Sequence, residues 1–140
     1  MAAMLGGLAP AGWALFILVR LGVGGSLAFH GYQKATGGLK HGQDLMTRMG
    51  LPPVMADLTT LLELLGGICL VVGLLTRVAG LLFALEFASI CWMKSAKMGA
   101  KLFNEPGKPS YELEFLYLML GVVFLCVGPG PYSLDRVFGI

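Results

Sequence analysis

Residues 54–93 read VMADLTTLLELLGGICLVVGLLTRVAGLLFALEFASICWM and are the most informative part of the chain about its fold. Two apolar segments make up this stretch, and only Thr76 and Arg77 separate them. Such a short connection predicts two antiparallel helices that lie side by side. Glu63 and Glu86 stand near the centres of the two segments, so each predicted helix carries a charge where its surroundings are most apolar.

Composition extends this pattern to the whole chain. Of its 140 residues, 56% are hydrophobic and 13% are charged, and the mean hydropathy is +0.79. Soluble domains contain about 25% charged residues. A soluble fold of this length would leave about a third of its chain surface exposed, which is too much for so apolar a sequence. We therefore predict an integral membrane protein with a single transmembrane domain over residues 1–140.

Four apolar segments are long enough to cross a bilayer, for which a helix needs about 20 residues. They span about residues 12–30, 54–75, 78–95 and 111–128. Helices satisfy their own backbone hydrogen bonds in lipid, and glycines in the first two segments allow close helix contacts. The predicted fold is an all-α, integral membrane four-helix bundle.

A short C-terminal interfacial helix is expected after the fourth segment. Residues 128–131 read GPGP, which stops a helix. Ser133 then has the character of an N-cap, and Asp135 would lie in the first turn, where the helix dipole favours negative charge.

Positive charges predict the orientation in the membrane. The two long connections carry Lys34, Lys40, Arg48, Lys94, Lys97, Lys101 and Lys108. The opposite side carries only Arg77 and Arg136. Cytoplasmic loops are enriched in lysine and arginine, so we expect a multi-pass protein whose long connections lie in the cytoplasm and whose termini both lie outside. No basic run or aromatic-interleaved patch indicates a nucleic-acid partner.

Three charges fall near the predicted helix centres. Arg20, Glu63 and Glu86 lie within about two residues, or roughly 3 Å, of the midpoints of their segments. A charge at that depth costs at least about 2.5–3.5 kcal/mol, so we expect the three to face inward and meet. Arg20 could pair with one carboxylate, and desolvation would favour the protonated form of the other. The alternatives are a proton or ligand site and an ion pair that only fixes helix packing.

A second polar layer is expected toward the cytoplasmic side. His30 ends the first segment and Glu114 lies near the start of the fourth. These two residues are candidates to line the cytoplasmic approach to the central site, and His30 can titrate near neutral pH. Ordinary interfacial polarity is the simpler explanation for both.

Several stretches together resemble the DoxX family of small four-span membrane proteins. They are Arg20-Leu21-Gly22 with the following His30-Gly31 and Lys34, then residues 63–67 (ELLGG) and 73–77 (GLLTR), and finally the tail at residues 128–136 (GPGPYSLDR). The resemblance extends from about Trp13 onward. Because the family is bacterial and archaeal, the resemblance implies a prokaryotic inner or plasma membrane as the location. The lysine-rich connection at residues 94–110 is less typical of the family.

This resemblance implies redox partnership, contact with a quinone, or sulfur chemistry, because family relatives are subunits of quinone-linked oxidoreductases. The expected function is a membrane accessory subunit of an oxidoreductase system that contacts quinone through Arg20, Glu63 and Glu86. The expected partners are the lipid bilayer and other membrane subunits, with a second copy of the chain as a further option. Two alternatives stay open: a scaffold or assembly factor without chemistry, and a small transporter or proton pathway.

Other cofactors receive no support from the sequence. The two histidines, His30 and His41, lie at or beyond one membrane edge, so they predict no haem ligand pair. The chain has no flavin or nicotinamide fingerprint and no metal-ligand spacing, so any electron donor would be another protein. The substrate, the oligomeric state and the presence of a catalytic activity are left open.

Overall fold

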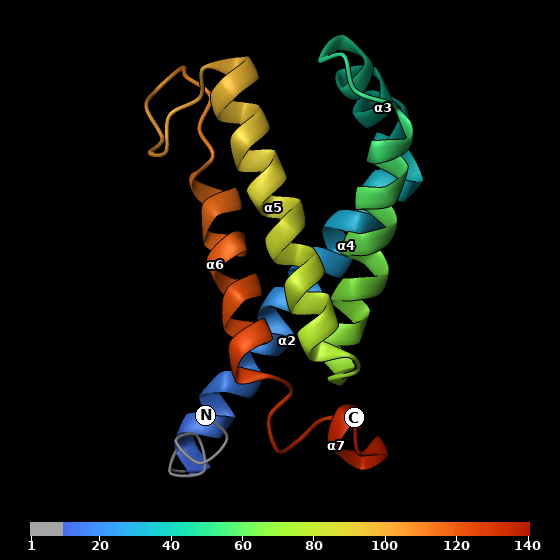
Figure 1. Cartoon of the computed structure of the whole chain (residues 1–140), viewed down its shortest axis with the longest axis vertical. Helices are drawn as coiled ribbons and strands as arrows, with labels where there is room; N and C mark the ends of the chain where they lie inside the picture. The colour runs from blue at the N-terminus through green and yellow to red at the C-terminus, as the bar shows by residue number, and fades with distance from the viewer. Residues whose placement is uncertain (1–9) are drawn as a thin grey trace.

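The computed structural model describes residues 10–140, and its regular elements are helices (Figure 1). They are α2 (Pro10–Gln33), the π-helix η1 (Lys34–Gly38), α3 (Leu39–Arg48), α4 (Val54–Val72), α5 (Thr76–Met98), α6 (Glu112–Val127) and α7 (Leu134–Phe138). This confirms the predicted all-α class. Element α2 continues through η1 into α3 without a break, so the first predicted segment is the lower part of a much longer helix.

Within the described residues, three helical stretches are long and apolar enough to cross a membrane. They are Ala11–Arg48, Val54–Val72 and Thr76–Met98. Helix α6 has 16 residues, fewer than the roughly 20 that a perpendicular crossing needs. It packs along α5 and completes the four-helix bundle, and its crossing of the bilayer stays a prediction.

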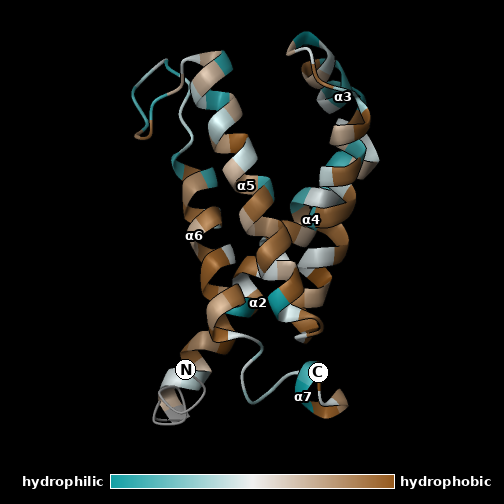
Figure 2. Cartoon of the chain, viewed as in Figure 1, coloured by the Kyte–Doolittle hydropathy of each residue, from teal (hydrophilic) through white to brown (hydrophobic). Residues whose placement is uncertain are grey.

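Apolar side chains cover the outside of this bundle. Leu15, Leu18, Leu61, Leu85 and Leu116 are each more than half exposed. Figure 2 shows the same hydrophobic colouring along α4, α5 and α6, with the hydrophilic residues gathered mainly toward the ends. An apolar surface of this extent requires a covering medium, and lipid supplies it. The membrane fold predicted from composition is therefore confirmed.

Small residues bring the helices together in two close pairs. A Cβ atom on Gly24 of α2 would lie 2.8 Å from the carbonyl oxygen of Gly67 in α4. In the second pair, a Cβ atom on Gly80 of α5 would lie 2.6 Å from the backbone nitrogen of Leu125 in α6. Only glycine permits backbones this close, so these contacts fix the register of each pair.

The two pairs meet around a shared core and separate toward one end. Leu70 and Phe83 are almost completely buried where the pairs meet. Ser26 and Tyr117 share a hydrogen bond of 2.7 Å between α2 and α6. Helices α4 and α5 lie together near their connecting turn, as their spacing predicted, and then diverge toward α3 (Figure 1).

The C-terminal segment closes the narrow end of the bundle. Ser133 accepts a hydrogen bond from the backbone N–H of Arg136 at 3.3 Å, which confirms the predicted N-cap of α7. Asp135 lies in the first turn of α7, as predicted, and its carboxylate also accepts the N–H groups of Leu75 and Thr76 and so caps α5. Leu75 has a positive φ of 49°, an unusual conformation for this residue that the Asp135 contact holds in place.

Candidate functional site

Arg20 does not meet the two glutamates, so the predicted central arrangement is wrong in this respect. Its guanidinium is buried and donates to two backbone carbonyls in the C-terminal segment, those of Pro129 and Tyr132. The Tyr132 contact measures 2.7 Å. A cation that satisfies carbonyl groups at the narrow end serves to anchor the tail, and Arg20 belongs to the scaffold of the fold.

The register of α2 against α4 explains this outcome. Gly24 lies against Gly67, and Gly31 lies against Leu64. Because the helices are antiparallel, continuing this register toward the start of α2 brings Arg20 to the end of α4, beside Gly73. Residues at the centres of two helices lie at the same depth only if the helices are not staggered. Helices α2 and α4 are staggered, so Arg20 and Glu63 lie at different depths.

Lys34 takes the place that Arg20 was expected to fill. Its Nζ atom donates to Oε1 of Glu63 over 2.6 Å. The Glu63 side chain is 5% exposed and that of Lys34 is 42% exposed, so the pair links the interior of the bundle to its surface. Lys34 begins the π-helix η1, and π-helical turns often occur at functional positions.

Glu86 is the most unusual group in the site. The residue is 8% exposed, and neither carboxylate oxygen finds a hydrogen-bond partner among residues 10–140. The charges of Glu63 and Lys34 act on it, so the three side chains form one electrostatic cluster. One lysine faces two carboxyl groups, and it donates its hydrogen bond to Glu63. The Glu86 carboxyl is thereby left available for another partner.

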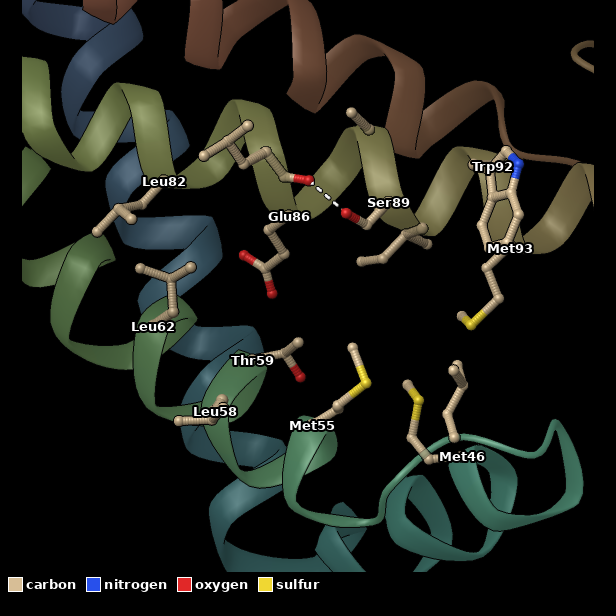
Figure 3. Close-up of a pocket in the computed structure, with 14 residues that line it drawn as sticks. Met46, Met55, Leu58, Thr59, Leu62, Leu82, Glu86, Ser89, Trp92 and Met93 are labelled. Carbon is tan, nitrogen blue, oxygen red and sulfur yellow. Dashed lines mark hydrogen bonds between the residues drawn. The ribbon is translucent and has the colours of Figure 1, made fainter.

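That carboxyl faces a groove of about 650 Å³ between α4 and α5. In Figure 3 the Glu86 side chain projects from α5 into the hollow, on the side where Thr59 of α4 lies. Ser89 lines the same hollow but donates its hydroxyl to the carbonyl of Leu85 at 2.8 Å. The volume is within the range of about 300–1,000 Å³ that small-molecule sites occupy.

The remaining walls of the groove are largely apolar and adaptable. Met46 of α3, Met55 of α4 and Met93 of α5 point into it from three helices (Figure 3). Methionine side chains are flexible and fit ligands of irregular shape. Trp92 lies at the end of the groove nearest the lysine-rich connection and is 63% exposed. An apolar cleft with one carboxyl is suited to a mainly hydrocarbon ligand that carries a polar head.

His30 and Glu114 lie outside this groove. His30 is on the exposed surface of α2. Glu114 accepts a hydrogen bond from Lys94 at 2.5 Å and so joins α6 to α5. Neither residue is among those that line the hollow around Glu86. Of the predicted site residues, the structure therefore brings together Glu63 and Glu86 and separates Arg20, His30 and Glu114 from them.

Sequence reasoning missed Lys34 as the partner of Glu63. Lys34 was grouped with the interfacial charges because it follows the first apolar segment. The signal that could have found it is the pairing of small residues across α2 and α4, since the contacts of Gly24 and Gly31 determine which residues face Glu63. A lysine side chain is also long enough to carry its charge well away from its own backbone depth.

Comparisons with known proteins agree with this architecture. The model of the DoxX family matches residues 15–94, which include α4, most of α2 and α5, and both glutamates. The chain is 32% identical over 96 residues to the inner membrane protein YqjF of Escherichia coli strain K12, and the match covers 68% of this chain and 70% of that relative. No solved structure matches the chain significantly.

Proposed function

Since this chain belongs to the DoxX family of membrane proteins, we propose that it is an accessory subunit of a membrane oxidoreductase system and that it binds a quinone or quinol in the groove between α4 and α5. The observation that carries the proposal is the buried Glu86 carboxyl, which faces a 650 Å³ apolar groove without a hydrogen-bond partner in the described chain. The relative is named as an inner membrane protein, and we propose the same location for this chain.

The fit of a quinol head to Glu86 follows from hydrogen-bond chemistry. An ionised carboxylate accepts a hydrogen bond from a hydroxyl group, and a protonated carboxyl donates one to a carbonyl. The same side chain can therefore hold the hydroxyl form and the carbonyl form of one ligand. A hydrogen bond to a charged group contributes about 1.5–3 kcal/mol, and leaving Glu86 unpaired in an apolar site costs a comparable amount.

The Lys34–Glu63 pair lies close to Glu86 but outside the groove. It places one positive charge near two carboxyl groups and connects the buried cluster with the exposed surface at η1. We assign Glu63 and Lys34 the role of positioning residues, because neither lines the groove.

Replacing Glu86 with glutamine tests the proposal. The amide keeps the size of the side chain and removes the charge-assisted hydrogen bond, so quinol binding should weaken about tenfold or more. Binding is measured by titrating a short-chain benzoquinol into the protein in lipid nanodiscs. Glu112→Gln is the matched control, since Glu112 is exposed at the start of α6, and it should leave the dissociation constant unchanged.

Mass spectrometry of the protein extracted with its native lipid completes the test. The proposal expects a bound quinone and copurifying oxidoreductase subunits in the parent chain, and loss of the quinone in Glu86→Gln. A copurifying partner with no quinone, together with unchanged titrations in Glu86→Gln, would establish the scaffold instead. Proton flux through liposomes that contain only this protein would favour the transporter.

A further inference from the structure

A second hollow lies on the same seam between α4 and α5, toward the narrow end of the bundle. Its volume is about 440 Å³. Leu58, Leu62 and Leu82 line both hollows, so the two form one continuous groove. Along α5 the groove reaches from Val78 to Trp92, a rise of about 20 Å at about 1.5 Å per residue. We call the second hollow the extension.

The two halves of the groove differ in polarity. Glu86, Thr59 and Ser89 lie in the half near α3. The extension has no charged residue among its lining positions within the described chain, and Leu65 is one of its walls. A polar head and an apolar chain on one ligand would match this division, with the head beside Glu86.

We infer that the extension holds the hydrocarbon chain of the amphiphile whose polar head contacts Glu86, a ligand with an alkyl or isoprenoid tail several carbons long. This inference rests on the proposed function for the identity of the head. Continuity with the Glu86 groove identifies the occupant as part of the same ligand. A ligand without a chain would bind beside Glu86 and leave the extension to unrelated lipid.

The energetic role of the extension differs from that of an apolar pocket in water. Lipid tails are as apolar as leucine, so moving a chain from the bilayer into the extension brings little hydrophobic gain. Binding of the chain in the extension therefore depends on packing contacts and on the orientation of the ligand. The extension therefore aligns the ligand along the seam, while the hydrogen bond to Glu86 distinguishes it from phospholipid.

Photocrosslinking tests where the chain lies. The probe is a benzoquinol with a decyl chain that carries a diazirine at its far end, added to the protein in nanodiscs and mapped by mass spectrometry after digestion. Crosslinks should concentrate on residues 61–69 and 75–82, and excess unlabelled decyl benzoquinol should remove them. Leu65→Trp, which fills the extension from a half-exposed position, should reduce them about fivefold or more.

Leu116→Trp, at an exposed position of α6 that lines neither hollow, should leave the crosslinks unchanged. Leu61→Trp repeats the test if Leu65→Trp does not fold. Crosslinks spread evenly over the outer faces of all the helices would overturn the inference. Crosslinks that neither Leu65→Trp nor Leu61→Trp reduces would overturn it as well. If a decane probe without the quinol head marks the same residues equally well, and Glu86→Gln changes nothing, the chain site stands and the proposed quinol function falls.

Discussion

At the scale of single residues, the site depends on how one cation is shared between two carboxyl groups. Lys34 donates to Glu63, and Glu86 has no hydrogen-bond partner in the part of the chain that the structure describes. Breaking a buried ion pair by removing one partner costs about 3–5 kcal/mol when both groups are fully buried. Lys34 is partly exposed, so its removal should cost less than this range.

Lys34→Met should accordingly lower the free energy of unfolding by about 1–3 kcal/mol, because Glu63 loses its partner in an apolar setting. The double variant Lys34→Met/Glu63→Met should recover most of this loss. Unfolding in mixed micelles, followed by circular dichroism, measures both values. Lys101→Met is the control, because Lys101 pairs with Glu105 in an exposed loop and such surface pairs contribute little to stability. Equal stability of Lys34→Met and the parent chain would show that the pair contributes nothing.

At the scale of the elements, close backbone contacts decide which helices pair and in what register. Helix α4 is connected to α5 by a short turn, yet its close partner along most of its length is α2. The contacts of Gly24 with Gly67 and of Gly80 with Leu125 hold the two pairs. The groove exists because α4 and α5 diverge between these pairs.

Two neighbouring glycines of α2 provide a matched test of this packing. A methyl group at Gly24 would lie 2.8 Å from the Gly67 oxygen and 2.9 Å from the Val71 nitrogen, so Gly24→Ala should destabilise the bundle by about 1–3 kcal/mol. A methyl group at Gly22 would meet nothing within 4 Å, and Gly22→Ala should be neutral or slightly stabilising. Thermal unfolding in detergent compares them. A loss of the same size in both variants would argue against a register fixed by Gly24.

At the scale of the whole molecule, charge is distributed unequally between the two ends. The start of α2 and helix α7 lie at the narrow end (Figure 1). The long connections lie together at the other end, where Lys97 donates to the carbonyl of Met49. In the loop that follows α5, Lys108 and Lys101 lower the pKa of Glu105, because both hydrogen-bond its carboxylate.

This charge distribution predicts that the long connections face the cytoplasm and that the termini face outward. Alkaline phosphatase fused after Ile140 should be active, since it folds outside the cytoplasm, and green fluorescent protein fused there should stay dark. The same reporters inserted at Gly107, in the long loop, should give the opposite pattern. A bright fluorescent fusion at Ile140 would reverse the orientation.

Composition and local patterns were enough to predict the membrane environment, the all-α class and several local boundaries. Ser133 caps α7 as predicted, and α6 ends at Val127 before the GPGP stretch. These features depend on composition and on interactions a few residues apart along the chain, so a single sequence contains the information they need. Glu63 and Glu86 were also identified as candidates from sequence, because a buried carboxyl is conspicuous in an apolar segment.

Which charges meet depends on how the helices pack, and the sequence did not predict it. Arg20 and Asp135 both act at the narrow end, where one anchors the tail and the other caps α5. Lys34 reaches Glu63 because α2 is staggered against α4. That stagger is set by backbone contacts between residues distant in the sequence. The groove that Glu86 faces likewise arises from the angle between two helix pairs, which neither helix specifies alone.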